Sequence, residues 1–171
     1  MPVAIFTVAV LIYAAAAAQD LRQRRVSNYF SAGIGLLGIA RWAVLMQIAP
    51  AAWAVAASAV IFGLGILVFS RGWLGGGDVK LITSTTLLIG GYDTPAFLFL
   101  MSIIGSALAL VVLIHIKFGR HLAAGRPEAM VPGSDGAVIA AADRFRVPYG
   151  VAVALAACVV LFVQILHIQR A

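Results

Sequence analysis

Residues 51–90 read AAWAVAASAVIFGLGILVFSRGWLGGGDVKLITSTTLLIG, which is two apolar runs joined by a break that holds a run of three glycines followed by one acid, Asp78. The first run, Ala51 to Phe69, is long enough to cross a bilayer as a helix, which takes roughly 17 to 25 residues. The second, Val79 to Gly90, would reach only about 20 Å at 1.5 Å per residue. We expect this short helix to be buried against its neighbours or to thin the bilayer locally.

The composition of the whole chain agrees with these two runs. It has 171 residues, of which 63% are hydrophobic and 11% charged, and its mean hydropathy is +1.06. Ordinary soluble domains do not approach such values, so we expect an integral membrane protein. The runs lack the alternation of barrel strands, which predicts an all-α helical bundle in a single domain, residues 1–171. Six spans are expected: Pro2 to Ala18, Tyr29 to Ile48, Ala51 to Phe69, Val79 to Gly90, Pro95 to Ile114 and Val147 to Ile168.

The basic residues predict the orientation of these spans. Arginine and lysine gather in the first, third and fifth connections, and the connections around Pro50 and Asp93 have neither. By the positive-inside rule, the basic connections are cytoplasmic and both termini lie outside. The longest connection, residues 115–146, is rich in glycine and proline and is expected to be a mobile cytoplasmic loop. A net charge of +6 distributed in this way indicates membrane anchors rather than a nucleic-acid surface.

Two features of the spans allow more than one interpretation. Arg41 is a cation inside a predicted span, so we expect it either to extend outward or to pair within the bundle. The first run could instead be a cleaved signal peptide, because Ala14 to Ala18 offers small residues. Its positive charges follow the apolar segment rather than precede it, which argues against that interpretation.

Two acids, Asp20 and Asp78, are the candidate catalytic residues. Both fall at a membrane boundary on the same predicted side, where a carboxylate is costly and therefore indicates a functional site. Two close carboxylates share one proton, so the pair offers a base and an acid together. Hydrolysis of a peptide by an activated water molecule requires that combination.

Each acid also has a structural interpretation. Asp78 could be an ordinary helix N-cap. Asp20 could form a local ion pair on a solvated face with one of three arginines: Arg22, Arg24 and Arg25. An acid at a helix C-terminus opposes the macrodipole, so helix stability alone does not explain Asp20. The glycines before Asp78 permit unusual backbone dihedrals and close approach of another chain, beyond what a cap needs, although a hinge could also use them.

Other chemistries find little support in the sequence. Three scattered histidines and the single Cys158 do not complete a metal site. The glycine run lacks the spacing of a phosphate-binding loop. Neither a metal nor an organic cofactor is expected.

The motifs resemble those of the aspartic prepilin peptidases, which are polytopic bacterial and archaeal membrane proteases with a Gly-x-Gly-Asp motif. Here that motif is Gly75-Gly76-Gly77-Asp78, followed by Val79-Lys80-Leu81. The first family signature is similar to Asp20-Leu21-Arg22-Gln23-Arg24-Arg25-Val26-Ser27-Asn28, with Ser27 in place of the usual proline, which we expect to leave the helix start less rigid. The last-span signature is similar to Val147-Pro148-Tyr149-Gly150. Without the cysteine pairs of longer relatives, the chain looks like the short, peptidase-only form associated with tight-adherence (Flp-type) pili.

This resemblance implies a protease of the GxGD type in the bacterial inner membrane that cleaves a prepilin leader on the cytoplasmic side. Asp20 and Asp78 would be the catalytic dyad, supported by the motif residues Gly75, Gly77, Lys80 and Asn28. The implied partners are a prepilin and the lipid bilayer, and the oligomeric state stays open. Two alternatives remain: a non-catalytic membrane component of pilus or secretion assembly, and a small ion or proton transporter.

Overall fold

The computed structural model describes residues 3–23, 27–123 and 149–170, and its regular structure in these ranges is entirely helical. Each apolar run identified in the sequence forms a helix, which confirms the all-α prediction. The helices are α1 (Val3–Gln23), α2 (Asn28–Leu45), α3 (Ile48–Ser70), α4 (Gly76–Ile89), α5 (Thr94–Ala123) and α7 (Tyr149–Arg170).

Four of these helices contain a stretch that is long and apolar enough to cross a membrane. They are α1, α3, residues Thr94–Ile114 of α5 and residues Tyr149–His167 of α7. The other two, α2 with 18 residues and α4 with 14, are not in this group. The polar residues Asn28 and Arg41 lower the hydropathy of α2, and α4 is simply short. Length and composition therefore support four span-capable helices, not the six that the sequence predicted.

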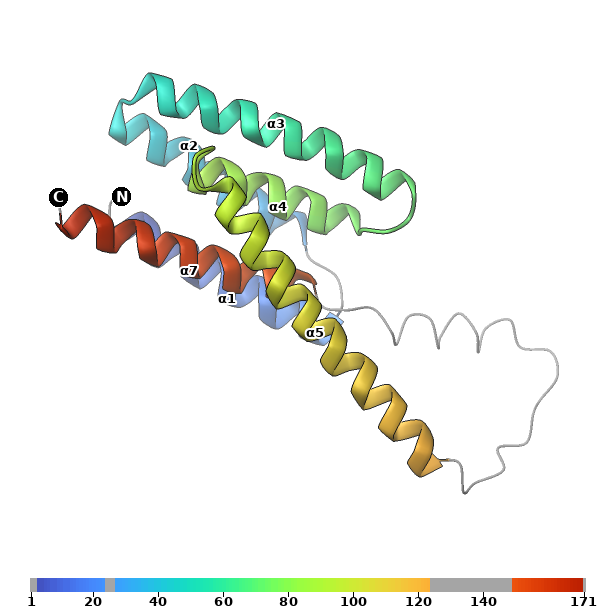
Figure 1. Cartoon of the computed structure of the whole chain (residues 1–171). Coiled ribbons are helices and arrows are strands. Elements are labelled where there is room, and N and C mark those ends of the chain that lie inside the picture. The colour runs from blue at the N-terminus through green and yellow to red at the C-terminus, as the bar shows by residue number, and fades with distance from the viewer. Residues whose placement is uncertain (1–2, 24–26, 124–148, 171) are drawn as a thin grey trace.

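The short helix α4 is the centre of the bundle. Helices α2, α3 and α7 pack against it, α1 packs on α7 and α2, and α5 packs on α7. In Figure 1, α4 lies between α3 and the pair formed by α1 and α7. Eight of its residues are buried: Val79, Leu81, Ile82, Ser84, Thr85, Thr86, Leu88 and Ile89. A helix surrounded by protein in this way can be shorter than the bilayer is thick, because its ends need not face lipid.

Successive helices run in alternating directions, so the bundle has two distinct ends. Both termini lie at one end in Figure 1, and the end of α1 and the beginning of α4 lie at the other. We call the second end the motif end, because it holds the C-terminal turns of α1 and the N-terminal turns of α2, α4 and α7. The first is called the opposite end.

Helix α5 is longer than expected. It continues to Ala123, so the predicted loop over residues 115–146 was wrong in its first nine positions. The first proline after Ile114 is Pro127, and the single Gly119 costs only about 1 kcal/mol in a helix, which is too little to end it. Residues 124–146 of the expected loop lie outside the described part of the chain.

Candidate active site

Asp78 lies in the first turn of α4 and is half-buried. The helix begins at Gly76, and its N-cap is Gly75, which makes no side-chain capping bond. Asp78 is thus the third residue of the helix, and the N-cap interpretation was wrong. In this position the carboxylate still benefits from the positive end of the helix macrodipole.

The glycines before Asp78 serve close approach rather than unusual backbone geometry. Gly75 has φ of −75° and ψ of 144°, which any residue can adopt, and Gly76 and Gly77 are helical. A Cβ atom on Gly75 would lie 2.8 Å from Oδ2 of Asp78, closer than real Cβ contacts come. A Cβ on Gly76 would lie 3.4 Å from the ring of Phe69 in α3. The expectation of unusual dihedrals was therefore wrong. The close neighbour of Gly75 is the side chain of Asp78 three residues later, so close approach of another chain stays a prediction.

Asp20 lies near the end of α1 and is buried, with 4% of its surface exposed. Its Oδ2 accepts a hydrogen bond of 2.8 Å from the backbone N–H of Gly150, 130 positions later in the chain. Gly150 is the second residue of α7, so its N–H belongs to the first turn, which has no partner within the helix. The placement of Asp20 on a solvated face was wrong. The N-terminus of α7 attracts the carboxylate and offsets the unfavourable dipole of α1.

A buried hydrogen bond sets the register between the helices that carry the two acids. The hydroxyl of Tyr13 in α1 donates to Oγ1 of Thr85 in α4 over 2.9 Å. Asp20 lies seven residues beyond Tyr13, and Asp78 lies seven residues before Thr85. Seven residues are close to two turns, or about 10.5 Å, so each acid lies on the same helix face as its hydrogen-bonded reference residue. Helices α1 and α4 run in opposite directions (Figure 1), so this spacing favours both acids at about the same level of the motif end.

The supporting residues Lys80 and Asn28 contact one another. Nζ of Lys80 donates a hydrogen bond of 3.1 Å to Oδ1 of Asn28, which joins the beginning of α4 to the beginning of α2. Both side chains are exposed. Just before Asn28, Ser27 is the N-cap of α2, and its side chain accepts from the N–H of Tyr29 over 3.5 Å. Serine thus starts the helix by capping it, where a proline would do so by fixing φ.

The opposite end of the bundle holds a second group of polar side chains, centred on Arg41. This arginine is 7% exposed, and its Nη1 donates to the carbonyls of Leu88 and Ile89, at the end of α4, and to Oε1 of Gln164 in α7. Pairing within the bundle is therefore confirmed for Arg41. A cation is favourable at this point because carbonyl groups end the helix there.

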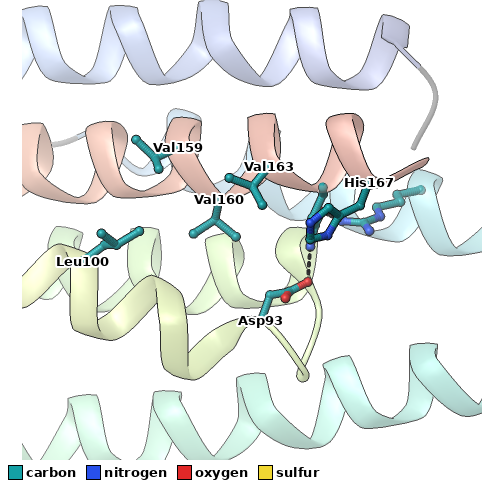
Figure 2. A pocket seen from close by; sticks show the side chains of 8 residues that line it. Asp93, Leu100, Val159, Val160, Val163 and His167 are labelled. Carbon is teal, nitrogen blue, oxygen red and sulfur yellow. Dashed lines mark hydrogen bonds between the residues drawn. The ribbon is translucent and has the colours of Figure 1, made fainter. Parts of the chain in front are cut away.

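Gln164 extends this polar group to the α4–α5 turn. It donates to the carbonyl of Ile89 over 2.9 Å and to the carboxylate of Asp93. Figure 2 shows Asp93 and His167 beside a pocket of about 310 Å³ that these residues line together with apolar side chains of α5 and α7. The end of α4 lies about 20 Å from its beginning, so this pocket is remote from Asp78.

Sequence reasoning missed several residues of the site. Tyr13 was hidden in an apolar run, and Thr85 in a run of four hydroxyl residues, Thr83 to Thr86. That run is unusual inside a predicted span and could have indicated polar contacts within the bundle. Gly150 belongs to a recognised signature, but no sequence feature links its N–H to Asp20.

Comparison with known proteins identifies the family. A model of the type IV leader peptidase family matches residues 5–110, which is more than half of the chain. The matched region includes Asp20, Asp78, the glycines before Asp78, and the hydrogen-bonded pair Tyr13 and Thr85. No curated protein and no solved structure matches the chain. From the extent of the family match and the motifs within it, we conclude that this helical membrane protein belongs to the type IV leader peptidase family.

Proposed function

We propose that this protein is a membrane aspartic endopeptidase that removes the leader of type IV prepilins, in particular those of Flp-type pili. Asp20 and Asp78 form its catalytic pair. Its architecture is of the GxGD type with six crossings, in which α2 and the short α4 cross as helices packed within the bundle. Both termini are outside, and the motif end faces the cytoplasm.

The observation that carries this proposal is the register fixed by Tyr13 and Thr85. It favours two carboxylates at one level of the bundle, each beside the N-terminus of a helix. The family match adds that peptide hydrolysis is the relevant chemistry. A helix N-terminus stabilises negative charge, which helps to hold an ionised carboxylate at the edge of an apolar bundle.

In the proposed reaction one acid acts as the general base and the other as the general acid. The ionised carboxylate takes a proton from a water molecule, whose oxygen adds to the carbon of the scissile peptide bond. The protonated carboxyl group donates its proton to the carbonyl oxygen. The tetrahedral intermediate then collapses, the C–N bond breaks, and the leaving nitrogen takes up the proton that came from the water. A carboxyl pair that shares one proton supplies both functions.

Leader removal in cells tests this function. The chain is co-expressed with a candidate Flp-type prepilin in a host without such peptidases, and the product is followed by gel shift and N-terminal sequencing. We expect cleavage after a glycine before the pilin's hydrophobic helix, and loss of cleavage with Asp20→Asn or Asp78→Asn. Asp93→Asn is the matched control, because it removes an acid at the opposite end. Unchanged cleavage by both motif-end variants, with the proteins present in the membrane, would refute the mechanism.

One observation favours a second function, that of a non-catalytic assembly component. The hydrogen bond from Gly150 to Asp20 would hold α1 to α7 whether or not Asp20 takes part in catalysis. Asparagine keeps a carbonyl oxygen that can accept this bond. Asp20→Asn therefore preserves the structural role and removes the catalytic one, so pilus assembly that survives this substitution would favour the assembly component.

A further inference from the structure

A groove follows α4 between α2 and α3 at the surface of the described helices. Its first part has a volume of about 440 Å³ and extends from Asn28 and Lys80 at the motif end to Leu87. Its second part, about 490 Å³, continues from Leu87 to Trp42 and the α2–α3 turn. Leu87 borders both parts. We call the two together the α2–α3 groove.

The packing of the helices explains why this groove exists. Helices α2 and α3 each pack closely on α4, whereas α2 against α3 is not one of the closely packed helix pairs in the described part of the chain. The two helices therefore form walls, and α4 forms the floor. An apolar helix laid into the groove would contact three helices at once.

We propose that the α2–α3 groove receives the hydrophobic helix of the prepilin substrate. This inference rests on the proposed function, because cleavage just before a hydrophobic helix requires the enzyme to hold that helix in the membrane. The groove begins at the hydrogen-bonded pair Lys80 and Asn28, and Lys80 is only two residues from Asp78. A chain leaving the groove at this end is next to the beginning of α4.

The lining of the groove suits a helix. Ser31, Ala32 and Gly35 on α2 and Ser58 on α3 are small, and small residues allow two helix backbones to approach closely. Space is open above Gly35, since a Cβ atom there would have Cβ of Ser84, at 3.8 Å, as its only close neighbour. The groove therefore has room for a side chain of a second helix beside Gly35.

A buried polar atom also indicates an occupant. Ser31 lines the groove and is 6% exposed, and its hydroxyl has no hydrogen-bond partner among the described residues. A buried hydroxyl without a partner costs free energy that a hydrogen bond would recover. The oxygen atom itself is covered, so a polar group on the bound helix, one turn inside the motif end, would supply that partner after a rotation of the Ser31 side chain.

The glycines before Asp78 give the substrate a path to the acids. Asp78 and Thr85 lie on the face of α4 toward α1, whereas Lys80 and Thr83 lie on the face toward the groove. An extended leader must cross the beginning of α4 to pass from one face to the other. Gly75, Gly76 and Gly77 carry no side chains there, and the space beside Gly75 borders the Asp78 carboxylate, so a backbone that passes Gly75 comes next to that acid.

Crosslinking to a trapped substrate tests the groove directly. A photoreactive amino acid is placed at Ala32 or Phe62, on the two walls of the groove, in the full chain carrying Asp78→Asn, and a Flp-type prepilin is co-expressed. The controls are Val44 on α2 and Leu64 on α3, which are exposed and do not line the groove. We expect prepilin adducts at Ala32 and Phe62 at least tenfold above those at Val44 and Leu64. Equal adducts at all four positions, or lipid adducts alone in the groove, would overturn the inference.

Filling the groove provides the second test. Gly35→Leu places a side chain in the groove, and Gly63→Leu on α3 is the matched control, because a Cβ there meets nothing within 4 Å. We expect Gly35→Leu to raise the KM for prepilin at least tenfold and Gly63→Leu to leave it unchanged, with both proteins equally stable to heat. Equal KM values for the two variants would overturn the inference that the groove binds the prepilin helix. Absence of leader removal by the unsubstituted chain would instead overturn the proposed function, so the two failures are distinguishable.

Discussion

The two ends of α4 each place a charged side chain where it interacts favourably with the helix macrodipole, but the charges are opposite. At its beginning, Asp78 places negative charge beside the N–H groups of the first turn, and at its end Arg41 places positive charge beside the last carbonyls. Both choices suit the helix macrodipole. At the opposite end, Gln164 joins Arg41 and Asp93 into one hydrogen-bonded group. At the motif end, the register of α1 and α4 favours two acids, Asp20 and Asp78, at one level of the bundle.

In the proposed function, this difference separates a structural cluster of polar residues from a catalytic pair. Opposite charges and amide groups at the opposite end stabilise each other and the helix that they cap. Like charges at the motif end do not, because two nearby carboxylates resist joint ionisation. An arrangement that stability alone would avoid is the kind found at catalytic sites. The following substitutions compare the two ends, beginning with the largest expected effect.

Removal of either motif-end acid should abolish catalysis without unfolding the protein. Asp20→Asn or Asp78→Asn should lower the rate of leader removal by at least about 100-fold, since general acid–base catalysis contributes roughly 10² to 10⁴. Asp93→Asn should retain a rate close to that of the unsubstituted chain. Rates measured by gel shift on purified protein check this, and an equal loss in all three variants would remove the distinction between the ends.

Removal of the cation at the opposite end should act on stability instead. Arg41→Leu removes the buried side-chain donor to the carbonyl of Leu88 and leaves that of Ile89 with Gln164 alone, which should cost about 1 to 3 kcal/mol of unfolding free energy. Thermal unfolding in detergent measures this change. The folded fraction should still cleave prepilin at a near-normal rate. A large loss of kcat at full stability would instead assign Arg41 a role in the reaction.

A methyl group next to Asp78 should disturb the motif end alone. Gly75→Ala introduces a Cβ 2.8 Å from Oδ2 of Asp78, so the carboxylate must move. We expect kcat to fall about tenfold with little change in unfolding temperature, because small displacements of a catalytic group are costly. Gly76→Ala is the control, since its Cβ would meet only a flexible phenylalanine ring at 3.4 Å. Equal kcat values for the two variants would contradict the close approach at Gly75.

The smallest effect is expected at the hydrogen bond that sets the register of α1 and α4. Tyr13→Phe and Thr85→Val should each cost about 1 kcal/mol of unfolding free energy, typical of one buried hydrogen bond. Because they remove the same bond, the double variant should cost less than the two single variants added together. Denaturant titration of all four proteins checks this. Full additivity would mean that the bond does not connect the two helices energetically.

The sequence predicted the helices well because hydrophobic runs of membrane length are a strong local signal. Even the short α4 was located within three residues at its start, since glycines precede it. Such local signals do not predict contacts between residues that are distant in the sequence. The end of α5 was misplaced because glycine is only a weak helix breaker. The role of Arg41 could not be predicted because it depends on the carbonyls of Leu88 and Ile89, which come close only when the helices pack.

The sequence identified the residues of the candidate site, but it did not predict which other residues contact them. Asp20 and Asp78 could be selected because acids are costly at such positions. Burial of Asp20, however, follows from the N-terminus of α7, which lies 130 positions away and comes close only after the helices pack. Likewise, the close contact between Gly75 and the Asp78 side chain could not be distinguished from unusual backbone dihedrals by sequence alone.

The central claim is that Asp20 and Asp78 act as one catalytic unit, and a double-mutant cycle on catalysis tests it most directly. Rates of prepilin cleavage are measured for Asp20→Asn, Asp78→Asn and the double variant. Residues that act as a unit are strongly non-additive, so the double variant should be no slower than the slower single variant, within a factor of about three. If the two losses multiply, or if either single variant keeps most of the activity, the acids do not form a pair.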